Sequence, residues 1–191
     1  MAGAPLTLKR WGRAEYARLV NLGVFEGEAL ELIDGQLVVA EPQGAYHASA
    51  ISAAEYAFRA ALPPGWIVRT QMPVSLDDLS EPEPDLVVVE GPPGDYRHAH
   101  PRRPAVVVEV AESSLEFDRE QKGSLYARAG IEDYWIVNLI DRVLEVHRDP
   151  EPDGLAPHGW RYRAVVRLTS GAIVGPLLLP SCRIAVADLL P

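Results

Sequence analysis

The chain has 191 residues, of which 48% are hydrophobic, and it carries a formal net charge of −9. This length and hydrophobic content predict one domain, residues 1–191, with a full hydrophobic core, and the lack of an apolar run of about 18 residues argues against a membrane span. The acidic net charge argues against the class of proteins that bind nucleic acid through their overall charge alone. A contact with a polyanion must therefore use a local basic patch or a bound cation.

The N-terminal region is predicted to contain a helix and a β-hairpin. Its first residues, MAGAPLTLKRWG, lack the apolar core of a signal peptide, so we expect a cytoplasmic protein. The sequence pattern predicts a helix over residues 7–22 that ends at Gly23. Residues 29–40, ALELIDGQLVVA, predict two strands joined at Asp34-Gly35, because an Asp-Gly pair between apolar runs favours a tight type I′ turn.

The centre of the chain is predicted to form a second helix and then strands. Residues 46–62 are rich in alanine and free of glycine and proline, which favours a helix that ends before Pro63-Pro64-Gly65. The next predicted strands are residues 66–74, 86–90 and 105–110. The last two are valine runs, and such runs usually lie in a sheet that is covered on both faces.

The remaining segments complete an alternation of helices and strands. A proline- and glycine-rich loop separates the two valine runs and holds the densest basic cluster of the chain, which comprises Arg97, His98, His100, Arg102 and Arg103. Residues 115–129 predict a third helix, ended by Gly130. Further strands are predicted at residues 134–138, 143–147 and 160–168, with a loop at 151–159. This order predicts an α/β or α+β fold, in which helices pack on a sheet.

Two residue types are scarce enough to be informative. Cys182 is the only cysteine, which excludes an internal disulfide and a cysteine-based zinc site, and we interpret it as a small structural residue. Lys9 and Lys122 are the only lysines, against sixteen arginines. Lys122 is therefore conspicuous, because surface cations in this chain are almost always arginine.

Two carboxylates interrupt or begin the valine runs. Pro84 lacks an N–H and fits the start of a strand, which places Asp85 at the strand entry. In AVVVEVA, the alternation of side chains puts Glu109 on the face of Val107. A lone buried carboxylate is costly unless it is paired, protonated or bound to a metal. If the two strands are neighbours, their spacing of roughly 4.8 Å lets both acids reach one hard cation, Mg²⁺ or Mn²⁺.

Lys122 completes this set of residues. It lies four residues after Asp118 and four before Tyr126, so all three share one helix face. Asp118 would hold the ammonium, and Lys122 would orient an attacking water or neutralise charge on a phosphate. Three of these residues also have a simpler interpretation. Asp85 could be a turn or cap residue, and Asp118 with Lys122 could be a solvated helical pair.

At these residues the chain resembles the Uma-type family of restriction-endonuclease-like proteins, in the PD-(D/E)xK nuclease superfamily. The segments that carry the resemblance are ELIDGQLVV, PDLVVV, VVVEVAESS and FDREQKGSLYARAGIEDYWIV. The resemblance implies a nuclease-like core, with a mixed β-sheet flanked by helices, and it implies that Asp85 and Glu109 match the acidic metal ligands.

The chain departs from the usual superfamily pattern in the position of its lysine. The pattern places a lysine two residues after the second acid, where this chain has Ala111. Lys122 resembles a relocated lysine on the following helix. The resemblance also implies that Glu31, from the first hairpin, completes the acidic cluster, and that His47 is the family's histidine. The alternatives are a solvent-facing strand residue for Glu31 and local hydrogen bonding at a helix start for His47.

The first functional hypothesis is therefore a metal-dependent endonuclease that hydrolyses DNA, with Mg²⁺ or Mn²⁺ as cofactor. Arg97, Arg102 and Arg103 are the candidates for phosphate contacts. A homodimer is expected, because cutting both strands of a duplex suits two-fold symmetry. The alternatives are a non-catalytic descendant that binds protein or nucleic acid, which the acidic charge favours, and a small phosphoesterase that acts on nucleotides.

Overall fold

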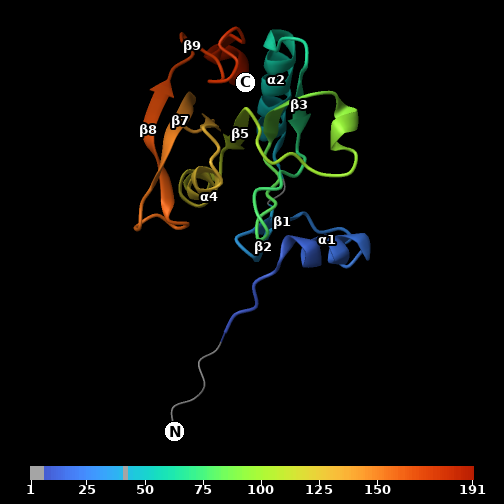
Figure 1. Ribbon diagram of the computed structural model, residues 1–191. Coiled ribbons are helices and arrows are strands. Elements are labelled where there is room, and N and C mark those ends of the chain that lie inside the picture. The colour runs from blue at the N-terminus through green and yellow to red at the C-terminus, as the bar shows by residue number, and fades with distance from the viewer. Residues whose placement is uncertain (1–6, 41–42) are drawn as a thin grey trace.

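The computed structural model describes residues 7–40 and 43–191, which fold as an α+β structure around a mixed β-sheet (Figure 1). Among these residues the main sheet has six strands in the order β3-β4-β5-β6-β7-β8. Their bounds are β3 (Trp66–Thr70), β4 (Leu86–Glu90), β5 (Val106–Ala111), β6 (Asp133–Asn138), β7 (Val143–Pro152) and β8 (Trp160–Leu168). β5 and β6 run parallel, and each other recorded pair in this sheet is antiparallel. The predicted fold class is confirmed.

The N-terminal region contains helix α1 (Arg13–Asn21) and the hairpin of β1 (Leu30–Ile33) and β2 (Gln36–Val39). Asp34 and Gly35 have φ angles of 47° and 78°, as the predicted turn requires. The predicted start of the helix at residue 7 is wrong. The chain before Gly12 is not helical, because the Trp11 N–H bonds to the carbonyl of Gly35 in the hairpin turn.

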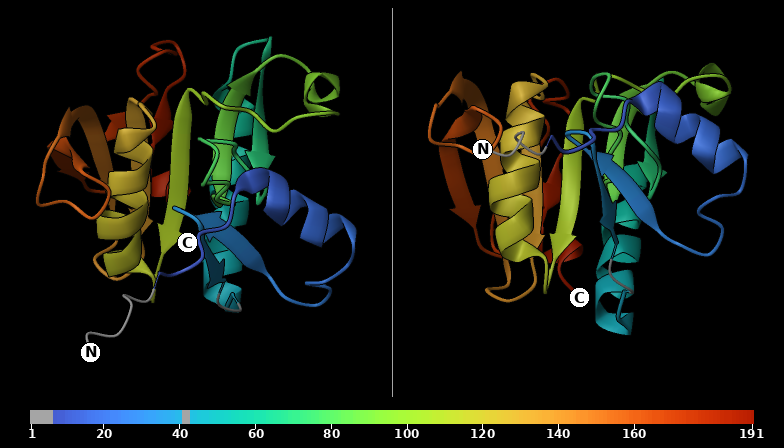
Figure 2. Two further views of the ribbon diagram at one scale, coloured as in Figure 1. Left: turned by 60° about the horizontal axis from the view of Figure 1, so that its bottom comes forward. Right: turned by 90° about the horizontal axis from the view of Figure 1, so that it is seen from below.

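Helices cover both faces of the sheet. Helix α2 (Ala45–Ala61) buries Ala50, Ala54 and Phe58 in a core that also holds Val106, Val108 and Val110 of β5. On the other face, a helical segment buries Leu125 and Tyr126 against Val107. This coverage explains why the valine runs are nearly unbroken, as predicted. Figure 2 shows this helical segment alongside β5.

The sequence predicted one regular helix over residues 115–129, and this prediction is wrong. The segment consists of α3 (Leu115–Phe117), the π-helical turn η2 (Asp118–Lys122) and α4 (Gly123–Arg128). The carbonyl of Asp118 accepts the Gly123 N–H, in an i→i+5 bond, and the hydroxyl of Tyr134 at 2.9 Å. Single π turns of this kind occur often at functional sites.

Two strand boundaries differ from the prediction. β3 ends at Thr70 instead of residue 74, because Gln71 takes a φ of 50° that breaks the extended ladder. β7 extends through Glu151 and Pro152, where a loop was predicted, because Pro152 pairs with Trp160 in a long β7–β8 hairpin. The other short elements are η1 (Pro93–Tyr96), β9 (Ile173–Val174), β10 (Ile184–Ala185) and η3 (Val186–Leu189).

The C-terminal segment closes the core on the α2 side. Cys182 is fully buried there with Ile184 and Leu189, which confirms its interpretation as a small structural residue. Among the described residues, no helix has both the length and the apolar character that crossing a bilayer requires.

Candidate active site

The neighbouring strands β4 and β5 bring the two acids together. Leu86 pairs with Val108 in the antiparallel ladder, so Asp85 and Glu109 lie opposite each other one step further along. The N–H of Asp85 donates to Oε2 of Glu109 at 3.3 Å, and the N–H of Val110 donates to Oδ2 of Asp85 at 2.8 Å. The residues are 8% and 3% exposed, so two carboxylates share a nearly dry corner.

Lys122 adds an ammonium to this corner. Its Nζ lies 3.0 Å from Oε1 of Glu109 and 3.3 Å from the carboxylate of Glu31. The expected contact with Asp118 is replaced by these two, and the carboxylate of Asp118 accepts the Ser114 hydroxyl at 2.6 Å. The π turn between Asp118 and Lys122 removes the regular i,i+4 spacing on which that expectation depended.

The β1–β2 hairpin delivers Glu31 from a distant part of the chain. The N–H of Glu81 bonds to the carbonyl of Leu32, and the N–H of Glu83 bonds to Oε2 of Glu31 at 3.2 Å. The hairpin is thereby attached to the segment that leads into Asp85. Glu31 is 8% exposed, so the alternative interpretation as a solvent-facing strand residue is wrong.

His47 approaches Asp85 from α2, whereas Lys122 belongs to η2. It sits in the first turn of α2, and its Nε2 is 3.4 Å from Oδ2 of Asp85. The hydrogen bond to Asp85 raises the pKa of His47 above its usual value, although burial opposes this shift. His47 therefore interacts with the site and does more than bond locally at a helix start.

Tyr126 belongs to the site, although the sequence assigned it no role. Its hydroxyl donates to Oε1 of Glu109 at 2.8 Å, and the residue is completely buried. The spacing that placed Tyr126 on the face of Lys122 was the signal for this contact. It did not identify the acceptor, because Glu109 comes from another element.

The site carries more negative than positive charge. Burial raises the pKa of Glu109 above its ordinary value, and nearby Asp118 and Asp85 add to the effect while Lys122 opposes it. Burial likewise raises the pKa of Asp118 to about 6. For Lys122, burial alone would lower the pKa, but the carboxylates of Glu109 and Glu31 outweigh it and raise the pKa. A further cation would relieve this excess of carboxylates.

The acids of the site are potential ligands for a divalent cation. Among residues 7–40 and 43–191, no group of three or more His, Cys, Asp or Glu side chains is arranged to hold an ion, which excludes a four-ligand zinc site built from them. Mg²⁺ usually binds through one or two carboxylates and keeps several waters. Asp85 and Glu109 carry carboxylate oxygens, which are the type of ligand that such an ion takes.

The predicted phosphate-binding arginines do not join the acids. Arg97, Arg102 and Arg103 lie in the loop that follows Glu90, and Glu90 itself is about 17 Å from Asp85 at the usual rise per strand residue. Figure 2 shows this loop at the end of the sheet away from the arrowhead of β5. The loop was predicted correctly, but strand length separates its arginines from the site.

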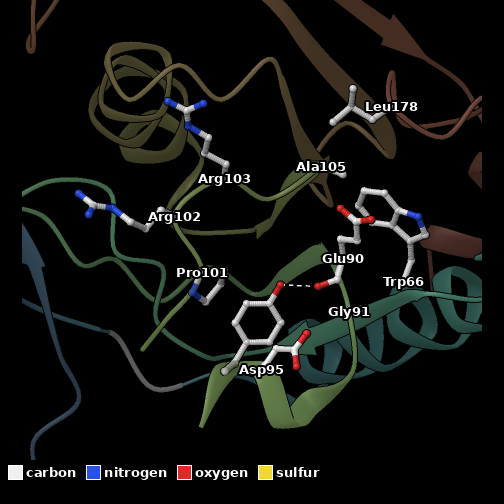
Figure 3. Close-up of a pocket in the computed structure, with 10 residues that line it drawn as sticks. Trp66, Glu90, Gly91, Asp95, Pro101, Arg102, Arg103, Ala105 and Leu178 are labelled. Atoms are coloured by element: carbon white, nitrogen blue, oxygen red, sulfur yellow. Dashed lines mark hydrogen bonds between the residues drawn. The ribbon is translucent and has the colours of Figure 1, made fainter. Parts of the chain in front are cut away.

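The basic loop borders a separate cavity of about 560 Å³, whose lining includes Trp66, Glu90, Arg102 and Arg103. Figure 3 shows that the two guanidinium groups point away from Trp66 and Glu90, so they do not converge on one ligand position.

Comparison with known proteins identifies a family and a fold. A family model described as "Uma2: Putative restriction endonuclease" matches residues 13–187. A crystal structure described as a "putative nuclease belonging to DUF820" from Anabaena variabilis superposes with a TM-score of 0.65 and covers 97% of both chains at 17% sequence identity. This likeness shows a shared fold. No curated protein matches the chain.

Proposed function

Because the chain belongs to the Uma2 family of restriction-endonuclease-like proteins, we propose that it is a divalent-cation-dependent endonuclease that hydrolyses the phosphodiester bonds of DNA. The observation that carries this proposal is the convergence of Asp85, Glu109 and Lys122, which three separate elements bring into one nearly dry corner. Two acids can hold the ion in metal-assisted phosphodiester hydrolysis, and an ammonium can stabilise the charge that develops on the phosphate.

Each residue has a distinct role in this proposal. Asp85 and Glu109 would hold Mg²⁺ or Mn²⁺, and the bound ion would lower the pKa of a water and offset the charge of the phosphate. The ammonium of Lys122 would orient the attacking water and neutralise charge that builds on the phosphate. Glu31 holds Lys122, and His47 holds the carboxylate of Asp85.

Glu109→Gln tests the proposal directly. This change keeps the shape of the side chain and removes its charge, so cleavage of supercoiled plasmid in Mg²⁺ or Mn²⁺ should be abolished while the melting temperature shows an intact fold. Glu90→Gln is the matched control, because Glu90 is exposed at the far end of β4. A Glu109→Gln protein that cuts DNA as fast as the parent contradicts the assignment.

The substrate class and the assembly need separate measurements. A panel of duplex DNA, RNA and small phosphodiesters separates the proposed endonuclease from a phosphoesterase of nucleotides, since only the endonuclease requires a long duplex. Sedimentation equilibrium tests the proposed homodimer. We propose a homodimer because cleavage of both strands of a duplex suits two-fold symmetry. A monomer at the protein concentrations used for cleavage contradicts the proposed homodimer.

A further inference from the structure

The hydroxyl of Tyr126 is a donor at Glu109 to which the proposed function gives no role. Oε1 of Glu109 accepts hydrogen bonds from Tyr126 at 2.8 Å and from Lys122 at 3.0 Å. Oε2 accepts the N–H of Asp85 at 3.3 Å. The two oxygens of one carboxylate are therefore divided: Oε1 faces the helix, and Oε2 faces the backbone N–H of Asp85.

The two donors at Oε1 differ in how firmly they are held. Lys122 has a flexible four-carbon chain, and its ammonium also contacts Glu31. The Tyr126 ring packs against Tyr134 with 5.0 Å between ring centroids, and Tyr134 stacks on Tyr162 at 5.9 Å.

We propose that Tyr126 is a positioning residue, whose hydroxyl fixes Oε1 of Glu109 so that Oε2 stays directed towards Asp85 when Lys122 turns to the substrate. This inference depends on the proposed function for the identity of the cation and the substrate. Hydrogen-bond partners that orient a ligating carboxylate typically change metal affinity or activity by about 10–100-fold when they are removed.

Mn²⁺ binding to the full chain, measured by calorimetry without DNA, tests this role in Tyr126→Phe. The variant keeps the ring and its packing but loses the donor, so its affinity for Mn²⁺ should fall by about 10–100-fold. The matched control is Tyr162→Phe, which loses a buried hydroxyl that donates at 2.7 Å to the backbone carbonyl of Ile131. The control should bind Mn²⁺ as tightly as the parent.

Kinetics and thermal melting separate positioning from a loss of structure. At saturating Mn²⁺ we expect Tyr126→Phe to have a lower kcat with an unchanged KM for DNA, whereas a simple loss of folded protein would follow the melting temperature in both tyrosine variants. Parent-like Mn²⁺ affinity in Tyr126→Phe, or an equal loss in Tyr162→Phe, overturns the positioning role.

The outcomes also distinguish this inference from the proposed function. A parent protein that binds Mn²⁺ but cleaves no nucleic acid refutes the nuclease, while the affinities of the two tyrosine variants still decide the role of Tyr126. A parent that binds no Mn²⁺ overturns both.

Discussion

The buried ammonium of Lys122 is important for the stability of the protein. Its side chain is 8% exposed and lies between two carboxylates that are themselves 10% and 4% exposed. Removing one partner of a buried ion pair leaves uncompensated charge and is strongly destabilising, whereas exposed pairs contribute little. The two lysines of this chain occupy these two extremes, because Lys9 pairs with Glu15 at the surface.

Lys122→Met should therefore destabilise the protein by about 3–5 kcal/mol. The reason is that Glu109 and Glu31 lose the cation between them and must remain buried side by side. Urea unfolding at neutral pH measures this loss, with Lys9→Met as the matched control that should change the free energy of unfolding by less than about 1 kcal/mol. Equal effects in the two variants would show that the buried pair has no special weight.

The pKa of Glu145 lets us predict how the stability of the protein changes at acid pH. Burial alone would raise its pKa, but the nearby His147 ring and hydrogen bonds from Arg119 and Asn138 lower the pKa below the ordinary value. A carboxyl whose pKa is lowered by folding adds stability above its unfolded pKa of about 4.3, and this stability is lost as the pH falls below that value.

Glu145→Gln should consequently be less stable than the parent at pH 7, and the difference should shrink as the pH falls from 5 to 3. The comparison is made by urea unfolding at several pH values within this range. A difference that stays constant with pH would mean that the charge of Glu145 is not the source of its contribution.

At the scale of elements, the π turn η2 sets the direction of the lysine. Gly123 follows this turn, and a Cβ at this position would lie 3.3 Å from the carbonyl oxygen of Asp118 and 3.6 Å from the Tyr134 ring. The φ of Gly123 is −58°, which any residue can adopt. The glycine is therefore needed for close packing and not for its backbone conformation.

Gly123→Ala should cost about 1–3 kcal/mol, since extra volume in a packed segment forces neighbours to move. It should also weaken Mn²⁺ binding, because the displaced turn carries Lys122 and leads into α4, which carries Tyr126. Gly94→Ala is the control, as nothing lies within 4 Å of its added Cβ. Thermal melts and calorimetry measure both effects, and parent-like values for Gly123→Ala would show that the turn tolerates the methyl group.

At the scale of the whole molecule, the net charge of −9 opposes the approach of a polyanion. The excess of carboxylates at the candidate site adds to this repulsion, and the arginines of the basic loop lie at the other end of β4. In the proposed function, a bound divalent cation would supply the local positive charge that lets a phosphate approach.

Duplex DNA should accordingly bind the protein in the presence of Mg²⁺ and dissociate when EDTA removes the ion. Filter binding at low temperature and short times measures this difference. Arg102→Gln with Arg103→Gln should leave the dependence on Mg²⁺ unchanged, because these side chains do not contact the acids. Equal binding with and without the ion would show that contacts elsewhere hold the DNA.

Local signals in the sequence determined most of the elements and part of the site. Asp34-Gly35 specified a turn because few residue pairs accept positive φ, and the valine runs specified strands buried on both faces. A glutamate among valines singled out Glu109, since an unpaired buried charge is costly. Such signals depend only on near neighbours in the chain, so they can be read without a fold.

Tertiary structure alone decided which of these groups meet. Strand pairing placed Asp85 opposite Glu109, docking of the hairpin brought Glu31 to Lys122, and strand length kept Arg102 away. The π turn and the acceptor of the Tyr126 hydroxyl were equally beyond the sequence. These contacts join residues that are distant in the chain, and their energies depend on burial and register, which the assembled sheet fixes.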